Sequence, residues 1–307
     1  MSLNFSIIGG TGFIGKHLVD HLLYQEVNSI QVLTRTSNVS NKSNLKYVKG
    51  NFLLPETISN FINKQDIVIN LAYIDQNYKA NMDLINKLIE SSLNSGVSKF
   101  IHCSSAVVSG RVDIPIITED TPCNPLSEYE KTKLAIEERL LEKLKGKIEL
   151  IIIRPTFVFG DGGKNLLKTI HSQLNNSRII NIASVMLNKY RKIHLVPVND
   201  VVTAIYYLAS TNINLSGEKF IISKDHDLEN NYFSIVNKIA FKIGSKRYYK
   251  VFFPFSTLIL MLILKLIGRT QLLPDQIYSS NKLYDYGFKS NTNLLDSIDK
   301  FIDCRTK

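Results

Sequence analysis

The stretch Phe5-Ser-Ile-Ile-Gly-Gly-Thr-Gly-Phe-Ile-Gly15 decides the fold, because it joins a short apolar run to glycines spaced three apart. Gly9 permits a tight turn after a strand, and Gly12 lets a pyrophosphate approach the backbone. Gly15 lets the following helix pack closely on that strand. The start of the helix offers free N–H groups and a partial positive charge to phosphates. This stretch predicts a strand, a phosphate-binding turn and a helix.

The pattern continues through the first 155 residues, where β-branched apolar runs alternate with amphipathic stretches. Such alternation is typical of βαβ units and a parallel sheet. The predicted strands are residues 5–8, 30–34, 45–48, 67–71, 100–103 and 149–153, and the predicted helices are residues 13–23, 77–95 and 127–145.

The chain becomes less regular after Gly160. A predicted strand at 194–198 and a helix at 201–209 are expected to return to the sheet domain. The predicted fold is an α/β doubly wound parallel sheet of the Rossmann type with a smaller C-terminal substrate-binding lobe. The domain boundaries follow from this: residues 1–160 with a return segment at about 193–212 form the sheet domain, and residues 161–190 and 215–307 form the lobe.

Composition narrows the class of protein. The 307 residues are 44% hydrophobic and 21% charged, an ordinary globular balance that excludes disordered, collagen-like and coiled-coil chains. Three cysteines, at positions 103, 123 and 304, indicate neither a disulfide framework nor a tetra-cysteine zinc site. No metal site is predicted. A reducing compartment, the cytoplasm, is expected, and the first ten residues do not resemble a signal peptide.

The net charge of +10 does not by itself indicate a polyanionic partner. The basic residues are scattered and are not interleaved with aromatic ones, so no nucleic-acid partner is expected. The apolar stretch 252–264 is too short to cross a bilayer, which needs about 20 apolar residues. We expect a buried helix there; the alternative is a surface-bound helix helped by the basic group at 242–250.

Tyr129 and Lys133 are four residues apart in a predicted helix, so both point to one side of it. A free tyrosine has a pKa near ~10 and is a poor acid or base at neutrality. The ammonium of Lys133 favours the phenolate, and we expect it to lower the pKa of Tyr129.

Several motifs of one protein family occur in order along residues 5–225. They are Gly9–Gly15 with its G-x-x-G-x-x-G spacing, Asp66–Tyr73, His102–Gly110, Tyr129–Lys133 with its Tyr-x-x-x-Lys spacing, Arg154–Gly160 and Val198–Val201. Together they resemble the extended short-chain dehydrogenases/reductases of the epimerase/dehydratase type, in particular the members that act on nucleotide sugars.

The resemblance implies roles for particular residues. Ser105, Tyr129 and Lys133 would be catalytic, with Ser105 bonded to the substrate oxygen. Asn81 would support a water relay to Lys133, although a local polar contact inside its helix is an equal alternative. The implied cofactor-binding residues are Gly9, Thr11, Gly12, Phe13, Ile14, Gly15, Arg35, Asn51, Phe52, Leu71, Ala72, Tyr73, Tyr129, Lys133 and Pro155. The family commonly dimerises through the helices at 77–95 and 127–145, so a homodimer is expected.

The end of the second strand bears on the choice of cofactor. An acidic residue there accepts from the free 2′-hydroxyl of NAD, whereas a nearby arginine accommodates the 2′-phosphate of NADP. This chain has Thr34-Arg35 and no acid at the strand end. A guanidinium binds a phosphate through paired hydrogen bonds, so NADP(H) is favoured, with NAD(H) as the alternative.

The predicted reaction is NADPH-dependent reduction of a ketone. By resemblance, the substrate is a UDP- or dTDP-linked 4-keto-6-deoxy sugar used for surface polysaccharide. An NAD-dependent nucleotide-sugar 4-epimerase is the alternative, since the same three residues serve it, and a non-catalytic dinucleotide-binding subunit is a second one. Dehydratases of the family carry an acidic pair directly after the active-site hydroxyl, where this chain has Ala106-Val107, so dehydration is not expected.

Overall fold

The computed structural model describes residues 3–36, 40–51, 57–58, 60–166, 170, 181, 184–185, 188, 191–242, 244 and 273–306. The chain divides into two compact units. The first comprises Met1–Gly110, Cys123–Pro155 and Val201–Phe220, and the second comprises Arg111–Pro122, Thr156–Asp200 and Ile221–Lys307.

The first unit is built on a seven-stranded sheet. Its strands are β1 (Asn4–Ile8), β2 (Ser29–Thr34), β3 (Leu45–Lys49), β4 (Ile67–Asn70), β5 (Lys99–Cys103), β7 (Glu149–Pro155) and β10 (Glu218–Ile222). Apart from the edge strand β3, the first six consist largely of β-branched and other apolar residues that are mostly buried on both faces, as expected of a parallel sheet covered by helices. These six lie within a residue or two of the predicted strands.

The order of strands in this sheet is β10-β7-β5-β4-β1-β2-β3. The strands from β7 to β3 pair in parallel, with Phe5 of β1 opposite Ile30 on one side and Ile67 on the other. The chain therefore moves outward in one direction from β1 to β3 and then in the other from β4. In such sheets a crevice opens at the carboxyl ends of the strands where the order reverses, here at β1 and β4.

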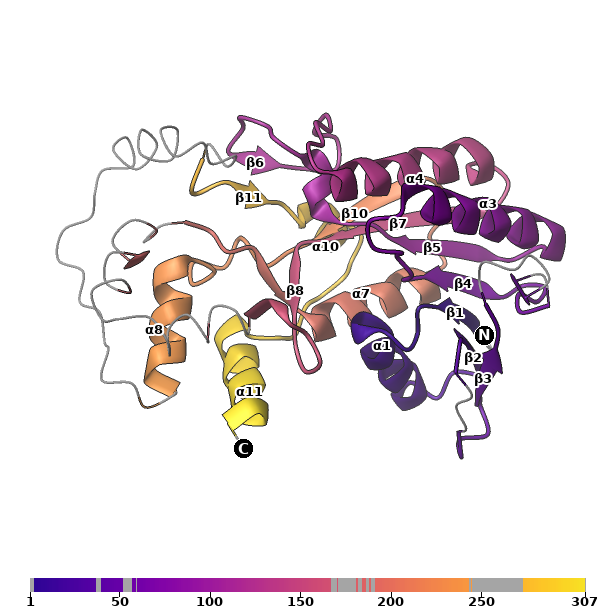
Figure 1. Cartoon of the computed structure of the whole chain (residues 1–307), viewed down its shortest axis with the longest axis horizontal. Helices are drawn as coiled ribbons and strands as arrows, with labels where there is room; N and C mark the ends of the chain where they lie inside the picture. Colours follow the sequence, from indigo (N-terminus) through magenta and orange to yellow (C-terminus); the bar gives the residue numbers. More distant parts are fainter. Residues whose placement is uncertain are drawn as a thin grey trace. The chain divides into compact units, whose positions relative to one another are not determined.

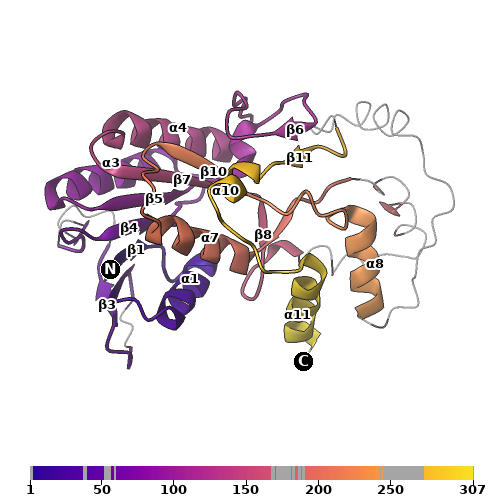
Figure 2. The same ribbon diagram turned by 180° about the vertical axis from the view of Figure 1, so that it is seen from behind.

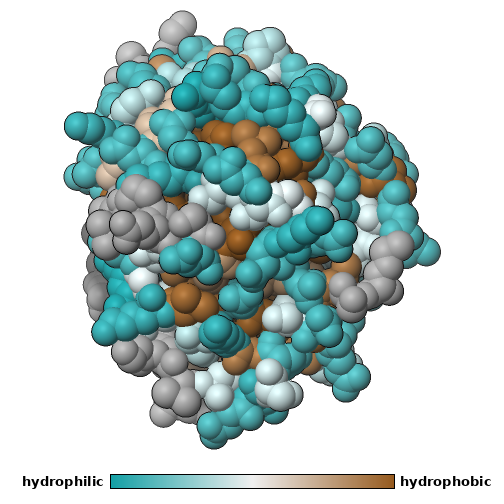
Figure 3. Space-filling view, turned by 90° about the vertical axis from the view of Figure 1, so that its right-hand side faces the viewer, coloured by the Kyte–Doolittle hydropathy of each residue, from teal (hydrophilic) through white to brown (hydrophobic). Residues whose placement is uncertain are grey.

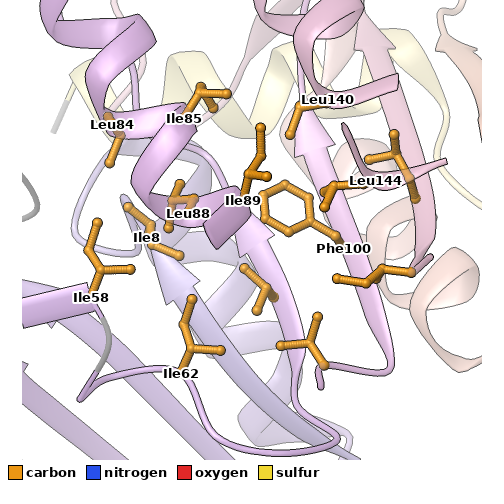
Figure 4. Close-up of a cluster of buried hydrophobic side chains, with 14 of the residues drawn as sticks. Ile8, Ile58, Ile62, Leu84, Ile85, Leu88, Ile89, Phe100, Leu140 and Leu144 are labelled. Atoms are coloured by element: carbon orange, nitrogen blue, oxygen red, sulfur yellow. The ribbon is translucent and has the colours of Figure 1, made fainter. Parts of the chain in front are cut away.

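Helices cover both faces of the sheet. Figures 1 and 2 show α3 (Tyr78–Ser95) and α4 (Glu128–Leu144) over one face, and α1 (Phe13–Tyr24) and α7 (Val198–Ser210) over the other. Figure 4 shows side chains of α3 and α4, among them Leu88 and Leu140, packed around Phe100 of β5. These three side chains are fully buried, and each contributes about 1.5–3 kcal/mol of hydrophobic free energy.

The second unit is less regular. It contains β6 (Ile116–Ile117), β8 (Phe157–Phe159), β9 (Leu195–Pro197), α8 (Tyr232–Lys242), β11 (Ile277–Tyr278), α10 (Asn281–Asp285) and α11 (Leu294–Thr306). Its main apolar cluster includes Phe159, Ile239 and Phe301. The buried carboxylate of Asp225 ties loops together, since it contacts Nδ1 of His194 at 2.6 Å and accepts from the backbone N–H of Tyr278 at 2.9 Å.

The structure differs from the predicted boundaries in three places. The strand at 194–198, expected in the sheet domain, is β9 and pairs with β8 in the second unit. The seventh strand of the large sheet is β10, which the sequence placed in the lobe. Residues 111–122, expected in the sheet domain, belong to the second unit, where β6 pairs with β11, 161 residues later in the chain.

The surface is mixed in character. On the side seen in Figure 3, hydrophilic residues cover most of the area, and apolar residues show as separate patches between them. Within the described ranges, no helix has both the length and the apolar character needed to cross a membrane. The apolar stretch at 252–264, predicted to form a packed or surface-bound helix, lies outside the described residues.

Candidate functional site

A cavity of about 400 Å³ opens in the first unit at the carboxyl ends of β1, β2, β3 and β4. It is lined by Gly9, Thr11, Gly12, Leu33, Thr34, Arg35, Gly50, Leu71, Ala72, Tyr73, Ile74 and Asp75. Seven of the residues predicted to bind the cofactor are among them: Gly9, Thr11, Gly12, Arg35, Leu71, Ala72 and Tyr73. The position agrees with the crevice expected where the strand order reverses.

The glycine turn forms one wall of this cavity. Gly9 has φ +84°, and a Cβ at this position would lie 2.8 Å from the backbone nitrogen of Ala72. The N–H of Gly12 donates to the carbonyl oxygen of Gly9 at 3.0 Å, which closes the turn. A Cβ on Gly15 would overlap the same carbonyl, so only glycine lets the helix start this close to the strand.

The turn leads directly into α1, which Phe13 and Ile14 open. The first N–H groups of a helix have no partner within the helix and can bind an anion. The backbone, left uncovered by side chains at Gly9 and Gly12, therefore fits the pyrophosphate of a dinucleotide. Phe13, Ile14 and Gly15 support the turn and do not line the cavity.

The ends of β2 and β3 form the opposite side. Thr34 is buried and Arg35 is exposed, and both line the cavity. β2 therefore ends without a carboxylate, as the sequence indicated. Asn51 is exposed beside the lining residue Gly50, and it is not itself part of the lining. Phe52 lies outside the described residues.

The segment after β4 is fixed by two buried asparagines. Asn70 Oδ1 accepts from the N–H of Ala72 at 3.1 Å, and Asn70 Nδ2 lies 3.2 Å from Nδ1 of His102. Burial lowers the pKa of His102 well below its usual value, and the charge of Lys133 lowers it further. His102 is therefore neutral, and its Nδ1 accepts the hydrogen bond from Asn70.

Asn81 of α3 is the second anchor. Its Nδ2 donates to the carbonyl oxygens of Ile74 at 2.6 Å and Asn77 at 2.8 Å, and its Oδ1 accepts from the N–H of Ile74 at 3.0 Å. Both amide hydrogens and the oxygen are thus engaged with the backbone. This geometry favours the local contact over the water relay to Lys133, and it places Asn81 behind the cavity wall at Ile74.

The start of α4 is closed by a reciprocal cap. Ser127 Oγ accepts from the N–H of Glu130 at 3.2 Å, and Glu130 Oε2 accepts from the N–H of Ser127 at the same distance. This capping box fixes the residue at which the helix begins. Tyr129 is the second residue of the helix, and Lys133 follows one turn later on the same side.

The hydroxyl of Tyr129 is hydrogen-bonded to the side chain of Ser105. Ser105 follows β5 and is half-buried, whereas its neighbour Ser104 is buried and its Oγ has no hydrogen-bond partner among the described residues. The structure thus brings Ser105, and not Ser104, to the phenol. The sequence motif implied a different contact for Ser105, with the oxygen of the substrate, and that role stays a prediction.

The pKa of Tyr129 moves in the direction opposite to our expectation. Partial burial, and then the charge of Cys103, raise the pKa of Tyr129 to about 12, against the smaller lowering effect of the bond to Ser105. Lys133, expected to lower this pKa, is not among the groups that shift it, and its Nζ donates to the carbonyl oxygen of Cys103 at 2.9 Å. Tyr129 is therefore a protonated phenol at neutral pH.

Lys133 is buried, with 4% of its surface exposed, and burial lowers its pKa while the charges of Cys103 and Glu137 oppose that change. Glu137, one turn further along α4, forms a fully buried ion pair with Arg154 of β7, with 2.6 Å between Nη2 and Oε2. Pro155, predicted to bind the cofactor, ends β7 beside Arg154 and is buried; it is not among the lining residues.

The sequence missed part of the cavity wall. Leu33, Thr34, Gly50, Ile74 and Asp75 also line it. Each lies at or just after the end of a predicted strand. The carboxyl ends of neighbouring parallel strands meet at one edge of a sheet, so this placement was the signal that could have found them.

Comparison with known proteins gives the family. The family model for the NAD dependent epimerase/dehydratase family matches residues 5–223. A UDP-glucose 4-epimerase from Vibrio cholerae is 25% identical over 244 residues, which cover 74% of this chain and 73% of that protein. A dTDP-D-glucose 4,6-dehydratase from Dictyostelium discoideum is 29% identical over 209 residues, 56% of this chain and 48% of that one. The chain spans about half the length of several curated relatives that it matches.

Solved structures agree on the fold. A dTDP-glucose 4,6-dehydratase from Bacillus anthracis in complex with NAD superposes with a TM-score of 0.72 at 17% identity, covering 99% of this chain and 96% of that one. The predicted Rossmann-type sheet is confirmed, and the matching family model agrees with the predicted class, an NAD(P)-dependent enzyme. Because the family model extends over both the glycine turn and the Tyr-x-x-x-Lys pair, the chain belongs to the NAD-dependent epimerase/dehydratase family of extended short-chain dehydrogenases/reductases.

Proposed function

We propose that the protein reduces a ketone on a nucleotide-activated 4-keto-6-deoxy sugar, with NADPH as the reductant, for surface polysaccharide synthesis. The observation that carries this proposal is the placement of Tyr129 beside Ser105 and one helical turn from Lys133, in the unit that holds the glycine turn. A bound nicotinamide supplies the hydride for the carbonyl carbon.

Residues of this chain then protonate and stabilise the ketone oxygen. Tyr129 donates its phenolic proton to the ketone oxygen, which becomes the hydroxyl of the product. The Ser105 hydroxyl hydrogen-bonds the same oxygen and stabilises the negative charge that develops on it. Lys133 lies one helical turn away on the same side of α4, and its proposed role is to bind the ribose of the cofactor.

The raised pKa of Tyr129 agrees with a role as the proton donor in ketone reduction. Ketone reduction needs a proton donor, whereas an epimerase must first remove a proton from a sugar hydroxyl. A phenol whose pKa is about 12 carries its proton at neutral pH and is a donor at the start of the reaction.

Arg35 supports NADP(H). Its guanidinium is exposed at the edge of the cavity, where it can reach the 2′-phosphate of a bound dinucleotide. β2 ends in Thr34, which offers no negative charge against that phosphate. The family as a whole uses either nicotinamide cofactor, so this preference is part of the proposal.

The second candidate is an NAD-dependent 4-epimerase of nucleotide sugars. It is favoured by the match to the UDP-glucose 4-epimerase, which covers nearly three quarters of each chain. The two candidates share Ser105, Tyr129 and Lys133 and differ in the net reaction. An epimerase returns the hydride and consumes no NADPH. For either one, we propose a cytoplasmic homodimer that pairs through α3 and α4.

One experiment separates them. The purified protein is incubated with NADPH and a dTDP- or UDP-linked 4-keto-6-deoxy sugar, and NADPH consumption is followed together with the formation of the 4-hydroxy sugar. In parallel, UDP-glucose is incubated with NAD and tested for UDP-galactose. Stoichiometric NADPH consumption supports the reductase, and interconversion of the two UDP-hexoses without net consumption supports the epimerase. The Tyr129→Phe variant is the control that ties turnover to this site.

A further inference from the structure

Tyr73 contacts three residues of α4 from the segment that follows β4. Its ring lies against the ring of Tyr129, with 4.9 Å between centroids and an interplanar angle of 81°. Its ring face lies 4.9 Å from Lys133 Nζ, and its hydroxyl is hydrogen-bonded to the side chain of Thr132. Positions 129, 132 and 133 lie on one side of the helix. Tyr73 therefore contacts the side of α4 that carries the two catalytic candidates, Tyr129 and Lys133.

The ammonium of Lys133 is held between two groups. On one side it donates to the carbonyl oxygen of Cys103, and on the other it faces the ring of Tyr73. A cation over an aromatic face is attracted by the electron density of the ring, and the attraction is stronger where water is excluded. Lys133 is 4% exposed, so this condition is met.

The phenol of Tyr129 is placed in a similar way. Ser105 bonds its hydroxyl, and Tyr73 meets its ring in an edge-to-face contact. Such pairs have a preferred geometry, which restricts the rotation of both rings. The hydrogen bond fixes the end of the side chain, and the ring contact fixes its plane.

The backbone of Tyr73 is anchored on each side. The N–H of Ala72 donates to Asn70 at 3.1 Å, and the N–H of Ile74 donates to Asn81 at 3.0 Å. Both asparagines are buried. Tyr73 is therefore presented to α4 from a segment that is tied to β4 and to α3.

We propose that Tyr73 is a positioning residue that holds Lys133 and Tyr129 in their reactive arrangement through its aromatic ring. This proposal rests on the proposed function and adds to it a residue that acts through two others. The ring is the part that matters, and the hydroxyl with its bond to Thr132 is secondary.

The test compares variants that keep the ring with variants that remove it. Tyr73→Phe keeps the ring and loses the hydroxyl, whereas Tyr73→Leu fills the space without an aromatic face, and Tyr73→Met is a second ring-free variant in case the leucine protein does not fold. We expect kcat to fall roughly tenfold or more for the ring-free variants, because small misplacements of reacting groups cost that much, and to fall by clearly less for Tyr73→Phe. The dissociation constant for NADPH is measured for each variant, since Tyr73 also lines the cavity.

A second measurement does not depend on turnover. The apo protein is treated with acetic anhydride, and the labelling rate of Lys133 is measured by mass spectrometry relative to Lys131, whose side chain is 53% exposed. In the ring-free variants, the ammonium of Lys133 loses its contact with the aromatic face and lies beside an aliphatic side chain instead. It then either moves toward solvent or loses its proton, and either change makes the amine more reactive toward acetic anhydride. We expect the relative rate to rise several-fold in Tyr73→Leu and Tyr73→Met and to stay unchanged in Tyr73→Phe.

The two measurements separate the two proposals. Wild-type kcat and wild-type labelling in the ring-free variants would overturn the role of Tyr73. A protein that turns over no keto sugar but shows the labelling pattern would refute the proposed function and support the placement of Lys133 by Tyr73. Loss of kcat in Tyr73→Phe equal to that in Tyr73→Leu would assign the effect to the hydroxyl and contradict the proposal.

Discussion

The glycine turn and the Tyr129 site lie in the same unit and are built from different parts of the chain. At the turn, the backbone forms the surface for the ligand, and Gly9, Gly12 and Gly15 matter because they carry no side chain. Around Tyr129 the site is formed by side chains: Ser105, Lys133 and Tyr73 each contact one another or the phenol. Glu137 and Arg154 form a buried ion pair next to them.

This difference predicts that substitutions in the two regions impair two different properties, ligand binding and proton transfer. Adding atoms at the glycine turn blocks a ligand and strains the fold, while chemistry at Tyr129 is untouched. Removing atoms at Tyr129 leaves the cofactor cavity in place and stops the proton transfer. The variants below test whether the two regions fail independently.

The largest effect is expected for Tyr129→Phe. The change keeps the ring and its contact with Tyr73 but removes the proton that the ketone oxygen receives. General acid catalysis is typically worth about 10²–10⁴-fold, so kcat falls by that order. NADPH affinity, measured by fluorescence titration, stays within a few-fold of the wild type. Near wild-type turnover would remove Tyr129 from the mechanism and favour the non-catalytic binding subunit.

The next effect is expected behind the site, at Glu137. Glu137→Leu leaves the charge of Arg154 buried and uncompensated, and breaking a buried pair in this way costs about 3–5 kcal/mol of unfolding free energy. The double variant Glu137→Leu with Arg154→Met removes both charges and recovers most of the stability. Chemical denaturation of the three proteins measures this. A single variant as stable as the wild type would show that the pair does not hold α4 on β7.

A smaller effect on stability, with a large one on binding, is expected for Gly9→Ala. The residue has φ +84°, and the left-handed conformation costs an alanine about 1–2 kcal/mol. The new Cβ also meets the backbone of Ala72, which lines the cavity. We expect NADPH affinity to fall at least tenfold while the Tyr129–Ser105 geometry is kept. The matched control is Gly96→Ala, also at positive φ but with open space around the new Cβ; it carries the strain without the loss of binding.

The smallest effect is expected for Arg35→Ala, which tests the basic side chain that lines the cavity together with the glycine turn. The preference for NADPH over NADH should shrink by about tenfold, mainly through weaker NADPH binding, because a guanidinium pairs with the 2′-phosphate. Titration of both cofactors at two salt concentrations measures it, since an exposed charge is screened by salt. Equal affinities for NADPH and NADH in the wild type would count against the reductase and for the epimerase.

The sequence predicted the first unit well because its signals are local. Apolar runs and helical spacing marked the strands and helices to within a few residues, and the spacing of Tyr129 and Lys133 placed both on one side of α4. What it could not predict depends on contacts between distant segments. The pairing of β9 with β8 and the pairing of β6 with β11 produce no periodic pattern in the sequences of the paired segments.

The same reason explains the errors within the site. Lys133 was expected to act on Tyr129, yet its ammonium contacts the carbonyl of Cys103, at the end of β5, and the ring of Tyr73, in the segment after β4. The raised pKa of Tyr129 follows from burial, which the sequence of α4 alone does not reveal. Asn81 was identified, but its three bonds to the backbone of Ile74 and Asn77 became clear only with the fold.

The capping box of Ser127 and Glu130 has a consequence for how the site forms during folding. Tyr129 lies in the first turn of α4, which the cap closes. The ends of helices fray, so a tyrosine in this position would move with the fraying turn without a cap. Because the cap spans the residues on either side of Tyr129, the closing of this turn and the placement of the phenol are one event.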